Sequence, residues 1–403
     1  MIDFKMDIPP CINAVLNILH SVGHEGYLVG GCVRDAVMGK TPHDYDITTD
    51  ALPEETKAAF ERDCKVIETG MKHGTVTVLS DGEPVEITTF RVDGEYRDNR
   101  HPESVRFTPN IEEDLARRDF TVNAIAYSPR KGIADPFGGV ADIEKRIIRC
   151  VGEPDRRFCE DGLRILRGLR FAATLGFEIE SETADSVRRN RELLRGISAE
   201  RIYVDFTKLL CGDFAERILK SFPETLRVFA PDTDSAAVAD IVSAVPNDKI
   251  LRLAAFLSLS DKESAERFMQ SMKADGAAKK ETVLLVSLLD EKTPKDRIAV
   301  KRLAAKCGIE TAEKYALLAR AAGKEIDLDM FCGTLKAIKD EKMCLSTSEL
   351  AINGDDLISE KIAVGREIGV VLSALLDEVI EEKTENKRDA LLAGARRIAK
   401  VRT

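Results

Sequence analysis

The chain has 403 residues, of which 44% are hydrophobic, and a formal net charge of −10. This length exceeds one ordinary core, so at least two domains are expected. The chain contains no apolar run near the roughly 18 residues of a membrane span, and its start does not resemble a signal peptide. Nine cysteines without a Cys-x-x-Cys pair favour reduced thiols over disulfides or a zinc site. These properties predict a cytoplasmic protein with no membrane partner.

Positive charge is concentrated in one segment, despite the acidic total. Residues 145–208 hold 14 basic and 11 acidic residues, so the rest of the chain carries the negative charge. A localised basic surface would bind anions such as phosphates. Solvated helix faces would give the same numbers, and charge alone does not separate these two interpretations.

The first part of the chain, to about residue 130, predicts a mixed α/β domain. Short strands are expected at YLVGG, DYDIT, KVIET, TVTVLS and VEITTF, where β-branched residues roughly alternate. PEETKAAFE predicts a helix with proline in its first turn. The segment 91–107 is polar and rich in both charges, which predicts a mobile loop.

From about residue 153 onward the pattern is helical. DGLRILRGLRFAATLGF places Leu163, Leu166 and Leu169 on one stripe that ends near Gly176. VLSALLDEVIEE repeats this spacing near the C-terminus. No histidine follows His101, which excludes a His-Asp metal phosphohydrolase site from the helical part. The expected order is an α/β head (1–150) and a helical neck, body and tail (151–215, 216–340 and 341–403).

Asp44 and Asp46 are separated by one residue in a predicted strand. Residues two apart on a strand point the same way, so both carboxylates would face one spot. Such oxygen ligands suit a hard cation such as Mg²⁺. A solvated Asp-x-Asp turn is the alternative.

Gly30 and Gly31 lie between a predicted strand and a predicted helix. Glycines in this place let the backbone approach a phosphate, and a helix N-terminus favours its negative charge. Arg34 lies in the first turn of the helix, where a guanidinium can bind phosphate bidentately. The spacings of the dinucleotide fingerprint and of the P-loop are both absent. A simple tight turn remains the alternative for the glycine pair.

These motifs together resemble a known signature. Gly-Gly, Val-Arg-Asp and an Asp-x-Asp thirteen residues after Gly31 are similar to the nucleotidyltransferase signature of the DNA polymerase β superfamily. HDYDITTDALPEE resembles its branch of class II tRNA nucleotidyltransferases and bacterial poly(A) polymerases, and RRDFTVNAIAYSP, EDGLRILRGLRFAA and GISAERI follow in that family's order. The resemblance is dense over about 27–210 and looser over about 345–380, and it leaves 210–345 unassigned.

The resemblance implies a polymerase-β-like head with a mixed antiparallel sheet, and it implies roles for particular residues. Asp44 and Asp46 would hold Mg²⁺ for two-metal phosphoryl transfer. Glu86 in VEITTF is the candidate for a third carboxylate, with an exposed strand residue as the alternative. The match to the family's ribose-recognition motif falls on three residues, Arg118, Asp119 and Asn123.

EDGLRILRGLRFAA resembles the family's nucleotide-selecting helix. Asp161 and Arg164 are three apart, and therefore adjacent on a helix face. A carboxylate beside a guanidinium matches the Watson–Crick edges of cytosine and adenine but not those of uracil and guanine; an exposed ion pair is the alternative. Arg167 is expected near the triphosphate. Arg170 lies half a turn from Asp161 on a straight helix, so it could instead face RNA or another helix.

The resemblance implies a CCA-adding enzyme that uses CTP and ATP with Mg²⁺ and binds the acceptor stem and T arm of tRNA through phosphates and shape. The segment 91–106 resembles a flexible family element that favours full CCA addition. One alternative is a poly(A) polymerase or an enzyme that adds only CC or only A. Another is a non-catalytic RNA-binding protein on the same scaffold.

Overall fold

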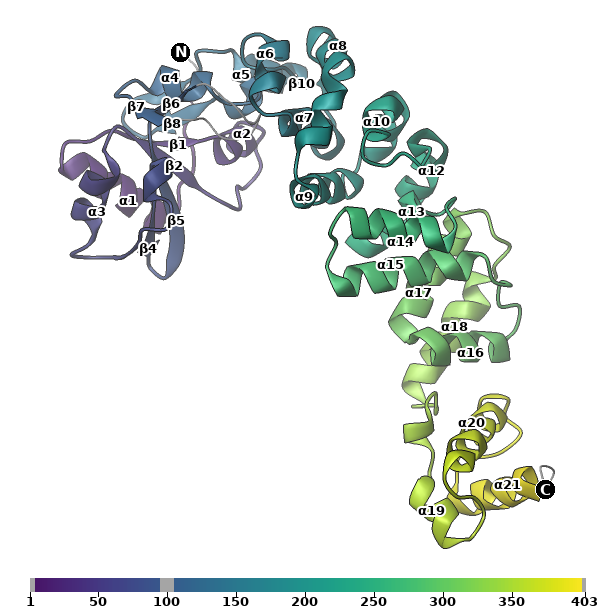
Figure 1. The fold of residues 1–403 in the computed structure, drawn as a ribbon. Coiled ribbons are helices and arrows are strands. Elements are labelled where there is room, and N and C mark those ends of the chain that lie inside the picture. Colours follow the sequence, from purple (N-terminus) through teal and green to yellow (C-terminus); the bar gives the residue numbers. More distant parts are fainter. Residues whose placement is uncertain (1–3, 95–104, 401–403) are drawn as a thin grey trace. The chain divides into compact units, whose positions relative to one another are not determined.

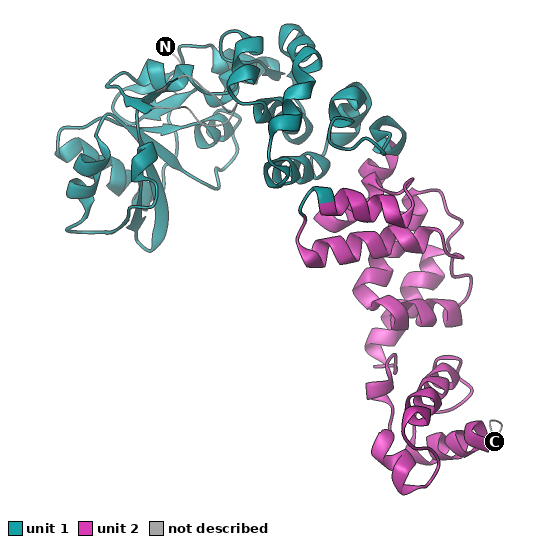
Figure 2. Ribbon diagram, in the orientation of Figure 1, with its two compact units in different colours: residues 1–239, 271–273 teal, residues 240–270, 274–403 magenta. Residues whose placement is uncertain are grey.

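A computed structural model describes residues 4–94 and 105–400. The chain divides into two compact units (Figure 2), of which the first comprises residues 1–239 with 271–273 and the second comprises residues 240–270 with 274–403. The finer division into head, neck, body and tail at residues 150, 215 and 340 stays a prediction.

The head is built on a seven-stranded sheet (Figure 1). Its strands are β1 (Gly26–Val29), β2 (Asp46–Thr49), β3 (Lys65–Ile67), β4 (Thr75–Ser80), β5 (Glu83–Thr89), β8 (Ala126–Ser128) and β9 (Gly132–Ala134). Their order is β3-β4-β5-β2-β1-β8-β9, with β2 and β5 parallel and all other neighbours antiparallel. The mixed sheet and the five strands expected in this region are confirmed.

Helices pack on the sheet because its strands alternate. In β4, Val76 and Val78 are buried, whereas Thr75, Thr77 and Leu79, which alternate with them, are partly exposed. Helices α1 (Pro10–Ser21) and α3 (Pro53–Phe60) contact β4 and one another. Helix α3 begins with the expected proline. Helices α2 (Gly31–Val37), α4 (Ile111–Ala116) and α5 (Gly139–Lys145) and a 3-10 turn, η2 (Thr121–Asn123), complete the head.

The segment 91–107 is not a loop throughout. It begins with β6 (Arg91–Asp93) and ends with β7 (Val105–Phe107), and these two strands pair with each other in antiparallel fashion. The two segments alternate weakly, and the sequence interpretation missed them because charged residues dominate the composition. Residues 95–104, the centre of the predicted mobile loop, lie outside the described residues.

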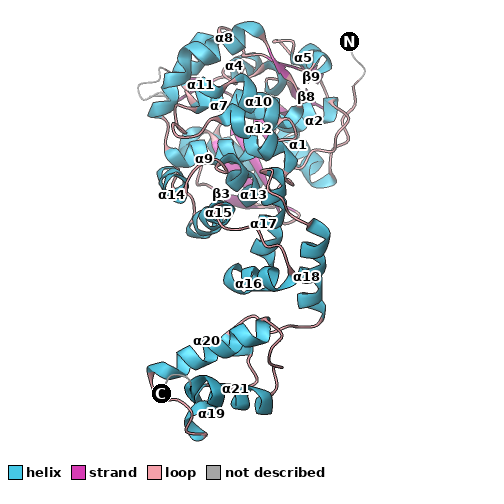
Figure 3. Ribbon diagram, turned by 90° about the vertical axis from the view of Figure 1, so that its right-hand side faces the viewer, coloured by secondary structure: helices cyan, strands magenta, loops and turns pink. Residues whose placement is uncertain are grey.

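The rest of the first unit is mainly helical (Figure 3). Its elements are α6 (Pro154–Glu160), α7 (Leu163–Leu175), α8 (Ser181–Asn190), α9 (Ala199–Leu210), α10 (Ala215–Ser221), α11 (Pro223–Leu226), the start of α12 (Ser235–Ala244), the paired β10 (Ile147–Ile148) and β11 (Glu178–Ile179), and the 3-10 helix η3 (Arg191–Gly196). The predicted stripe of α7 is confirmed: Leu166 and Leu169 are fully buried, and the helix ends at Gly176. Gly168 lets α7 approach the head, since a Cβ there would lie 2.9 Å from the Phe120 ring.

The second unit is helical in the part of the chain that the structure describes. It contains α13 (Lys249–Phe256), α14 (Lys262–Ser271), α15 (Gly276–Leu289), α16 (Arg297–Cys307), α17 (Ile309–Ala321), α18 (Leu328–Asp340), a 3-10 turn, η4 (Thr347–Glu349), α19 (Gly354–Ser359), α20 (Arg366–Ile380) and α21 (Arg388–Lys400). Leu357, Leu375 and Leu391 form the fully buried centre of an apolar cluster near the C-terminus. Over residues 4–94 and 105–400, every helix is too short or too polar to cross a bilayer.

Candidate active site

A pocket of about 810 Å³ lies within the first unit, and it falls in the size range of small-molecule sites. All the predicted site residues except Glu86 line it, together with Gly30 of the predicted glycine turn and other residues that the sequence did not assign to a site. The predicted residues are Gly31, Arg34, Asp44, Asp46, Arg118, Asp119, Asn123, Asp161, Arg164, Arg167 and Arg170. The additional ones are Gly30, Arg117, Leu163, Phe171, Thr174, Leu175, Arg201, Lys208 and Cys211.

Two carboxylates mark the head side of the pocket. Asp46 is the first residue of β2, whereas Asp44 precedes the strand, so the expectation that both lie on one strand is wrong. They nevertheless line the same pocket. Burial raises the pKa of Asp46, the Asp44 charge raises it further, and the Arg118 charge opposes both. A carboxylate whose charge is disfavoured by a neighbouring carboxylate fits a hard divalent cation held by oxygen ligands.

Glu86 does not line the pocket, but the sheet places it beside Asp46. The parallel pairing of β2 and β5 makes Asp46 and Glu86 direct partners in register. Side chains of in-register neighbours on adjacent strands lie on the same face of a sheet. Within residues 4–94 and 105–400, no group of three His, Cys, Asp or Glu side chains is gathered tightly enough to hold a metal ion. The third-carboxylate role of Glu86 therefore stays a prediction.

Gly30 and Arg34 form the junction between β1 and α2. Gly30 has φ +76°, a left-handed conformation that glycine adopts at little cost, and it precedes α2 directly. Arg34 Nη1 donates to Asn123 Oδ1 at 2.7 Å, and its Nε and Nη2 donate to Asp35 Oδ1 at 2.9 and 2.8 Å. The guanidinium is thus held in place at the pocket before any ligand arrives.

The buried carboxylate of Asp119, in the head, forms an ion pair with the half-buried guanidinium of Arg167, in α7. Arg167 donates from Nε to Asp119 Oδ2 at 2.7 Å, and its Nη2 lies 2.6 Å from the same oxygen. Asn123 Nδ2 donates to Asp119 Oδ1 at 3.4 Å. Burial alone would raise the pKa of Asp119, but the adjacent Arg167 guanidinium holds it below its ordinary value. Asp119 is therefore an anion that orients Arg167 within the pocket.

The two expected base-reading residues do not lie side by side on one helix. Helix α6 ends at Glu160 and α7 begins at Leu163, so Asp161 lies in the break between them, and its Oδ1 accepts the Leu163 N–H at 3.0 Å. The spacing argument failed because it assumed one continuous helix. Asp161 and Arg164 still line the same pocket.

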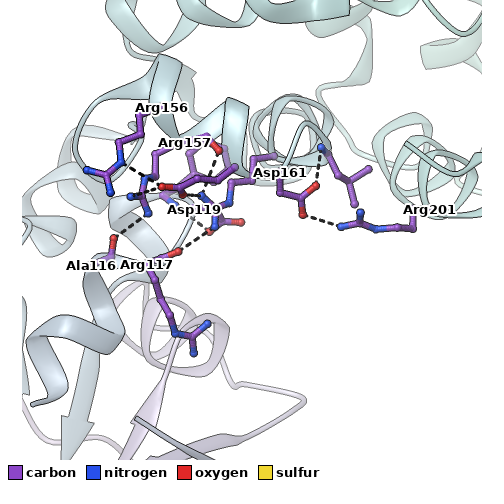
Figure 4. A network of polar contacts seen from close by, with 11 residues as sticks. Ala116, Arg117, Asp119, Arg156, Arg157, Asp161 and Arg201 are labelled. Carbon is purple, nitrogen blue, oxygen red and sulfur yellow. Dashed lines mark hydrogen bonds and ion pairs between the residues drawn. The ribbon is translucent and has the colours of Figure 1, made fainter. Parts of the chain in front are cut away.

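Each of these two side chains has its own support, and Figure 4 shows the contact between Asp161 and Arg201. Asp161 Oδ2 accepts from Arg201 Nη2 at 2.7 Å. Arg164 is 8% exposed, and it donates to Glu160 Oε2 at 2.7 Å and to the Arg117 carbonyl at 3.1 Å. The two groups are therefore not the exposed i,i+3 ion pair that was the alternative interpretation of the sequence.

Helical geometry left open whether Arg170 contacts the nucleotide or another helix, and the structure combines the two positions. Its Nη1 binds the carboxylate of Asp205 in α9, a neighbouring helix, and its side chain also lines the pocket. Its guanidinium lies 4.3 Å from the centre of the Phe171 ring, and those of Arg34 and Arg167 lie 5.6 and 5.4 Å from it. Three cations around one aromatic ring make this side of the pocket suited to a polyanion.

Sequence reasoning missed Arg117, Arg157 and Arg201. Arg157 Nη1 donates to the Ala116 carbonyl at 3.2 Å, which joins α6 to the head. The contacts of Arg157 with Ala116 and of Arg201 with Asp161 span 41 and 40 residues, so no local spacing in the sequence indicates them. The GISAERI motif contains Arg201 and was the available signal, but it gave no role for the residue.

Comparison with known proteins identifies the family. A model of the poly A polymerase head domain matches residues 26–149, one of a probable RNA- and SrmB-binding site of polymerase A matches 176–235, and one of a tRNA nucleotidyltransferase domain 2 (putative) matches 247–395. The CCA-adding enzyme of Lactobacillus helveticus is 35% identical over 388 residues, 94% of each chain. The chain belongs to the CCA-adding enzymes.

Further CCA-adding enzymes match over the same length. That of Bacillus cytotoxicus is 36% identical over 94% of this chain and 96% of its own. The crystal structure of the Bacillus stearothermophilus CCA-adding enzyme in complex with CTP is 30% identical and superimposes with a TM-score of 0.85 over 98% of this chain and 99% of that one. The expected family, its polymerase-β-like head and the nucleotidyltransferase activity are therefore confirmed.

The family also decides between the functional alternatives. Relatives that match over 94% of this chain are CCA-adding enzymes, so the chain is a tRNA nucleotidyltransferase of this type rather than a poly(A) polymerase or a non-catalytic scaffold. CCA-adding enzymes and the other nucleotidyltransferases of this family typically use divalent metal ions. Such chemistry needs carboxylates for the metal and positive charge for the phosphates. The pocket has both: Asp44 and Asp46 form an acidic corner, and arginines that include Arg34 and Arg167 form a cationic wall.

Proposed function

We propose that this protein adds C, C and A in turn to the 3′ end of tRNA, with CTP and ATP as substrates, Mg²⁺ as the metal and no nucleic-acid template. The observation that carries the proposal is that three groups of side chains line one pocket. They are two carboxylates, several guanidiniums, and the pair Asp161 and Arg164. We place this activity in the cytoplasm, in keeping with nine cysteines that are all free thiols.

The acidic corner carries the chemical step. Asp44 and Asp46 would hold Mg²⁺, with Glu86 beside them on β5. A Mg²⁺ ion held by these carboxylates would supply positive charge that stabilises the negative charge of an in-line phosphoryl transfer. The 3′-hydroxyl of tRNA attacks the α-phosphorus, the bond to the bridging oxygen breaks, and pyrophosphate leaves. Glu86 would accept a hydrogen bond from the attacking hydroxyl and take up its proton as the O–P bond forms.

The cationic wall binds the triphosphate. Arg34 and Arg167 are each held by a carboxylate, Asp35 and Asp119 respectively, so their guanidiniums face the ligand without first being ordered. Preorganised charge of this kind costs no rearrangement when the leaving pyrophosphate gains negative charge. The Gly30–Gly31 turn allows the backbone close to the phosphates. Arg118 and Asn123 would contact the ribose.

The base lies between Asp161 and Arg164 in this proposal. Asp161 accepts from the exocyclic amine of cytosine or adenine, and Arg164 donates to the ring nitrogen. Uracil and guanine present a donor and an acceptor in the reversed order, which leaves polar groups without partners. Buried polar sites of this kind reject wrong bases by up to about 10⁴–10⁵.

The tRNA would be held through its acceptor stem and T arm by the helical parts. A-form RNA exposes phosphates and 2′-hydroxyls more readily than base edges, which suits a partner common to all tRNAs. Such binding weakens as salt rises, because counterions are released from phosphates.

The test is incorporation on tRNAs that end at the discriminator base, at C or at CC. Each labelled nucleotide is supplied in turn with Mg²⁺, and products are read on sequencing gels. We expect two C and one A, and then a stop. A halt after CC, or a ladder of A on any RNA, would contradict the proposal. Chelation should abolish incorporation, and Mg²⁺ should restore it; recovery with Mn²⁺ but not with Mg²⁺ would contradict the choice of metal.

A further inference from the structure

A fully buried carboxylate lies behind the pocket. Asp114, in α4, has no exposed surface and does not line the pocket. Its Oδ1 accepts from Arg117 Nε at 3.0 Å and from Nη2 at 2.8 Å, and its Oδ2 accepts from Arg118 Nη2 at 3.3 Å. The same Oδ1 accepts the backbone N–H of Arg91, at the start of β6, at 3.2 Å. One side chain therefore ties a strand end to two pocket arginines.

Asp114 is the ion-pair partner that holds Arg118. Among the described residues, Asp114 is the one carboxylate paired with Arg118, and Arg118 Nε is buried without a partner. The other terminal nitrogen of the guanidinium, Nη1, reaches Gly30, which forms the floor of the pocket. It would lie 3.2 Å from a Cβ placed on Gly30. Arg118 thus bridges Asp114 and the Gly30 turn.

The energetics favour a rigid arrangement. Burial alone would raise the pKa of Asp114, but the Arg117 and Arg118 guanidiniums hold it below its ordinary value, so the group is an anion. A buried charge is tolerated only when its lone pairs are satisfied, and removing a partner is costly. The geometry that stabilises Asp114 therefore also fixes Arg118.

The same arrangement recurs around the pocket. Arg34 is held by Asp35, Arg167 by Asp119 and Arg170 by Asp205. Asp114 differs from Asp35 and Asp119 because it is completely buried and serves two arginines. It has no access to a ligand of its own.

We propose that Asp114 is a positioning residue for nucleotide transfer, which aims Arg118 at the floor of the pocket beside Gly30 and Asp46. This inference rests on the proposed function of the pocket as the nucleotide site. Asp114 acts through Arg118 and does not touch the nucleotide.

A double-mutant cycle tests this coupling. The variants are Asp114→Asn, Arg118→Gln and the pair, and the readouts are kcat/KM for CTP and the CTP dissociation constant by calorimetry. We expect Asp114→Asn alone to lower kcat/KM by about tenfold to a hundredfold, the usual effect of losing a residue that orients a functional group. In the Arg118→Gln background the same change should have almost no further effect.

The matched control is Asp142→Asn. Asp142 is another buried carboxylate, 6% exposed, that accepts from Thr121 Oγ1 at 2.7 Å and from Arg149 Nε at 3.1 Å, and it does not line the pocket. We expect its effect on kcat/KM to be the same with and without Arg118. If Asp114→Asn, like Asp142→Asn, changes kcat/KM by the same factor with and without Arg118, the proposal is overturned. A merely structural role would not depend on Arg118.

Folding and function are checked separately. If circular dichroism shows that Asp114→Asn is unfolded, Asp114→Glu replaces it: the charge stays but the carboxylate moves, and the same coupling to Arg118 is expected. Additivity in that cycle would also overturn the proposal. Calorimetry reports the coupling without turnover, so a wild-type protein that binds CTP but adds no nucleotide would defeat the proposed function and leave the coupling measurable. Wild-type protein that neither binds nor adds CTP would defeat both.

Discussion

Arg201 Nη2 donates to Asp161 Oδ2 at 2.7 Å, and this contact joins two residues 40 positions apart. Asp161 lies in the break between α6 and α7, where no helix fixes its side chain, while Arg201 projects from α9. A carboxylate that reads a base edge has to present a defined oxygen. Arg201 occupies one oxygen, and the Leu163 N–H binds the other at 3.0 Å.

Replacing Arg201 should therefore relax base selection. For Arg201→Met we expect the ratio of kcat/KM for CTP over that for UTP to fall by about tenfold, because Asp161 then rotates and also accepts from water. Arg195→Met is the control, since Arg195 is an exposed arginine that pairs only with Glu192 in the described chain. Competition between labelled CTP and UTP measures the ratio. A preserved ratio would show that Asp161 does not need Arg201.

Removing the charge of Asp46 should stop the chemistry. Asp46→Asn keeps the size of the side chain but loses a carboxylate at the acidic corner of the pocket. We expect the single-turnover rate of C addition to fall by at least about a thousandfold, equivalent to roughly 4 kcal/mol of barrier. The exposed Asp63→Asn in the same head should behave as wild type. A loss below tenfold would remove Asp46 from the metal site.

Glu86 gives a graded version of the same experiment. It is exposed, and its register places it beside Asp46. If it lies near the attacking hydroxyl, Glu86→Gln lowers kcat by about a hundredfold and leaves the KM for CTP nearly unchanged. Glu83, at the start of the same strand and paired in register with Ser80, supplies the control substitution Glu83→Gln. Equal kcat values for the two variants would mean that Glu86 is a surface residue.

The Asp119–Arg167 pair predicts how stability changes with pH. The pKa of Asp119 in the folded protein lies below the ordinary value of 3.8, so its stabilisation is complete at neutral pH and is lost as pH falls through the folded-state pKa. We expect Asp119→Asn to lower Tm at pH 7. The Tm values of the two proteins should converge as the pH falls below the ordinary value of 3.8 towards the folded-state pKa, where the wild-type protein loses this contribution. Thermal melts across that range check the prediction; a constant difference in Tm would contradict it.

The fold of the head could be predicted because its signals are local. Alternating β-branched residues and the proline at the first position of α3 follow from rules that act within a few residues. The short strands that begin at Arg91 and Val105 were missed because charged residues there obscure a weak alternation of apolar and polar residues. The helices of 210–345 were expected as helices, but nothing local to them indicates a role.

The site was predictable in membership but not in geometry. Motifs named most of the lining residues, yet the placement of Asp161 on a helix was wrong, because a break between α6 and α7 is set by packing rather than by spacing. Arg201 and Asp114 were absent from the expectations for a related reason. Each acts by holding another side chain, and the sequence does not show which residues meet in space.

The parallel pairing of β2 with β5 has a consequence for how the protein acquires activity. Asp46 and Glu86 become neighbours only when the chain closes a loop of 40 residues that contains β3 and β4, as the Thr48 to Thr88 contact of the same strand pair shows. Contacts of such long range form late, because the entropy of closing the loop is lost before the pairing repays it. A partly folded head can contain every strand and still lack Glu86 beside Asp46 at the acidic corner. During refolding, metal-dependent CTP binding should therefore appear after the secondary structure is complete.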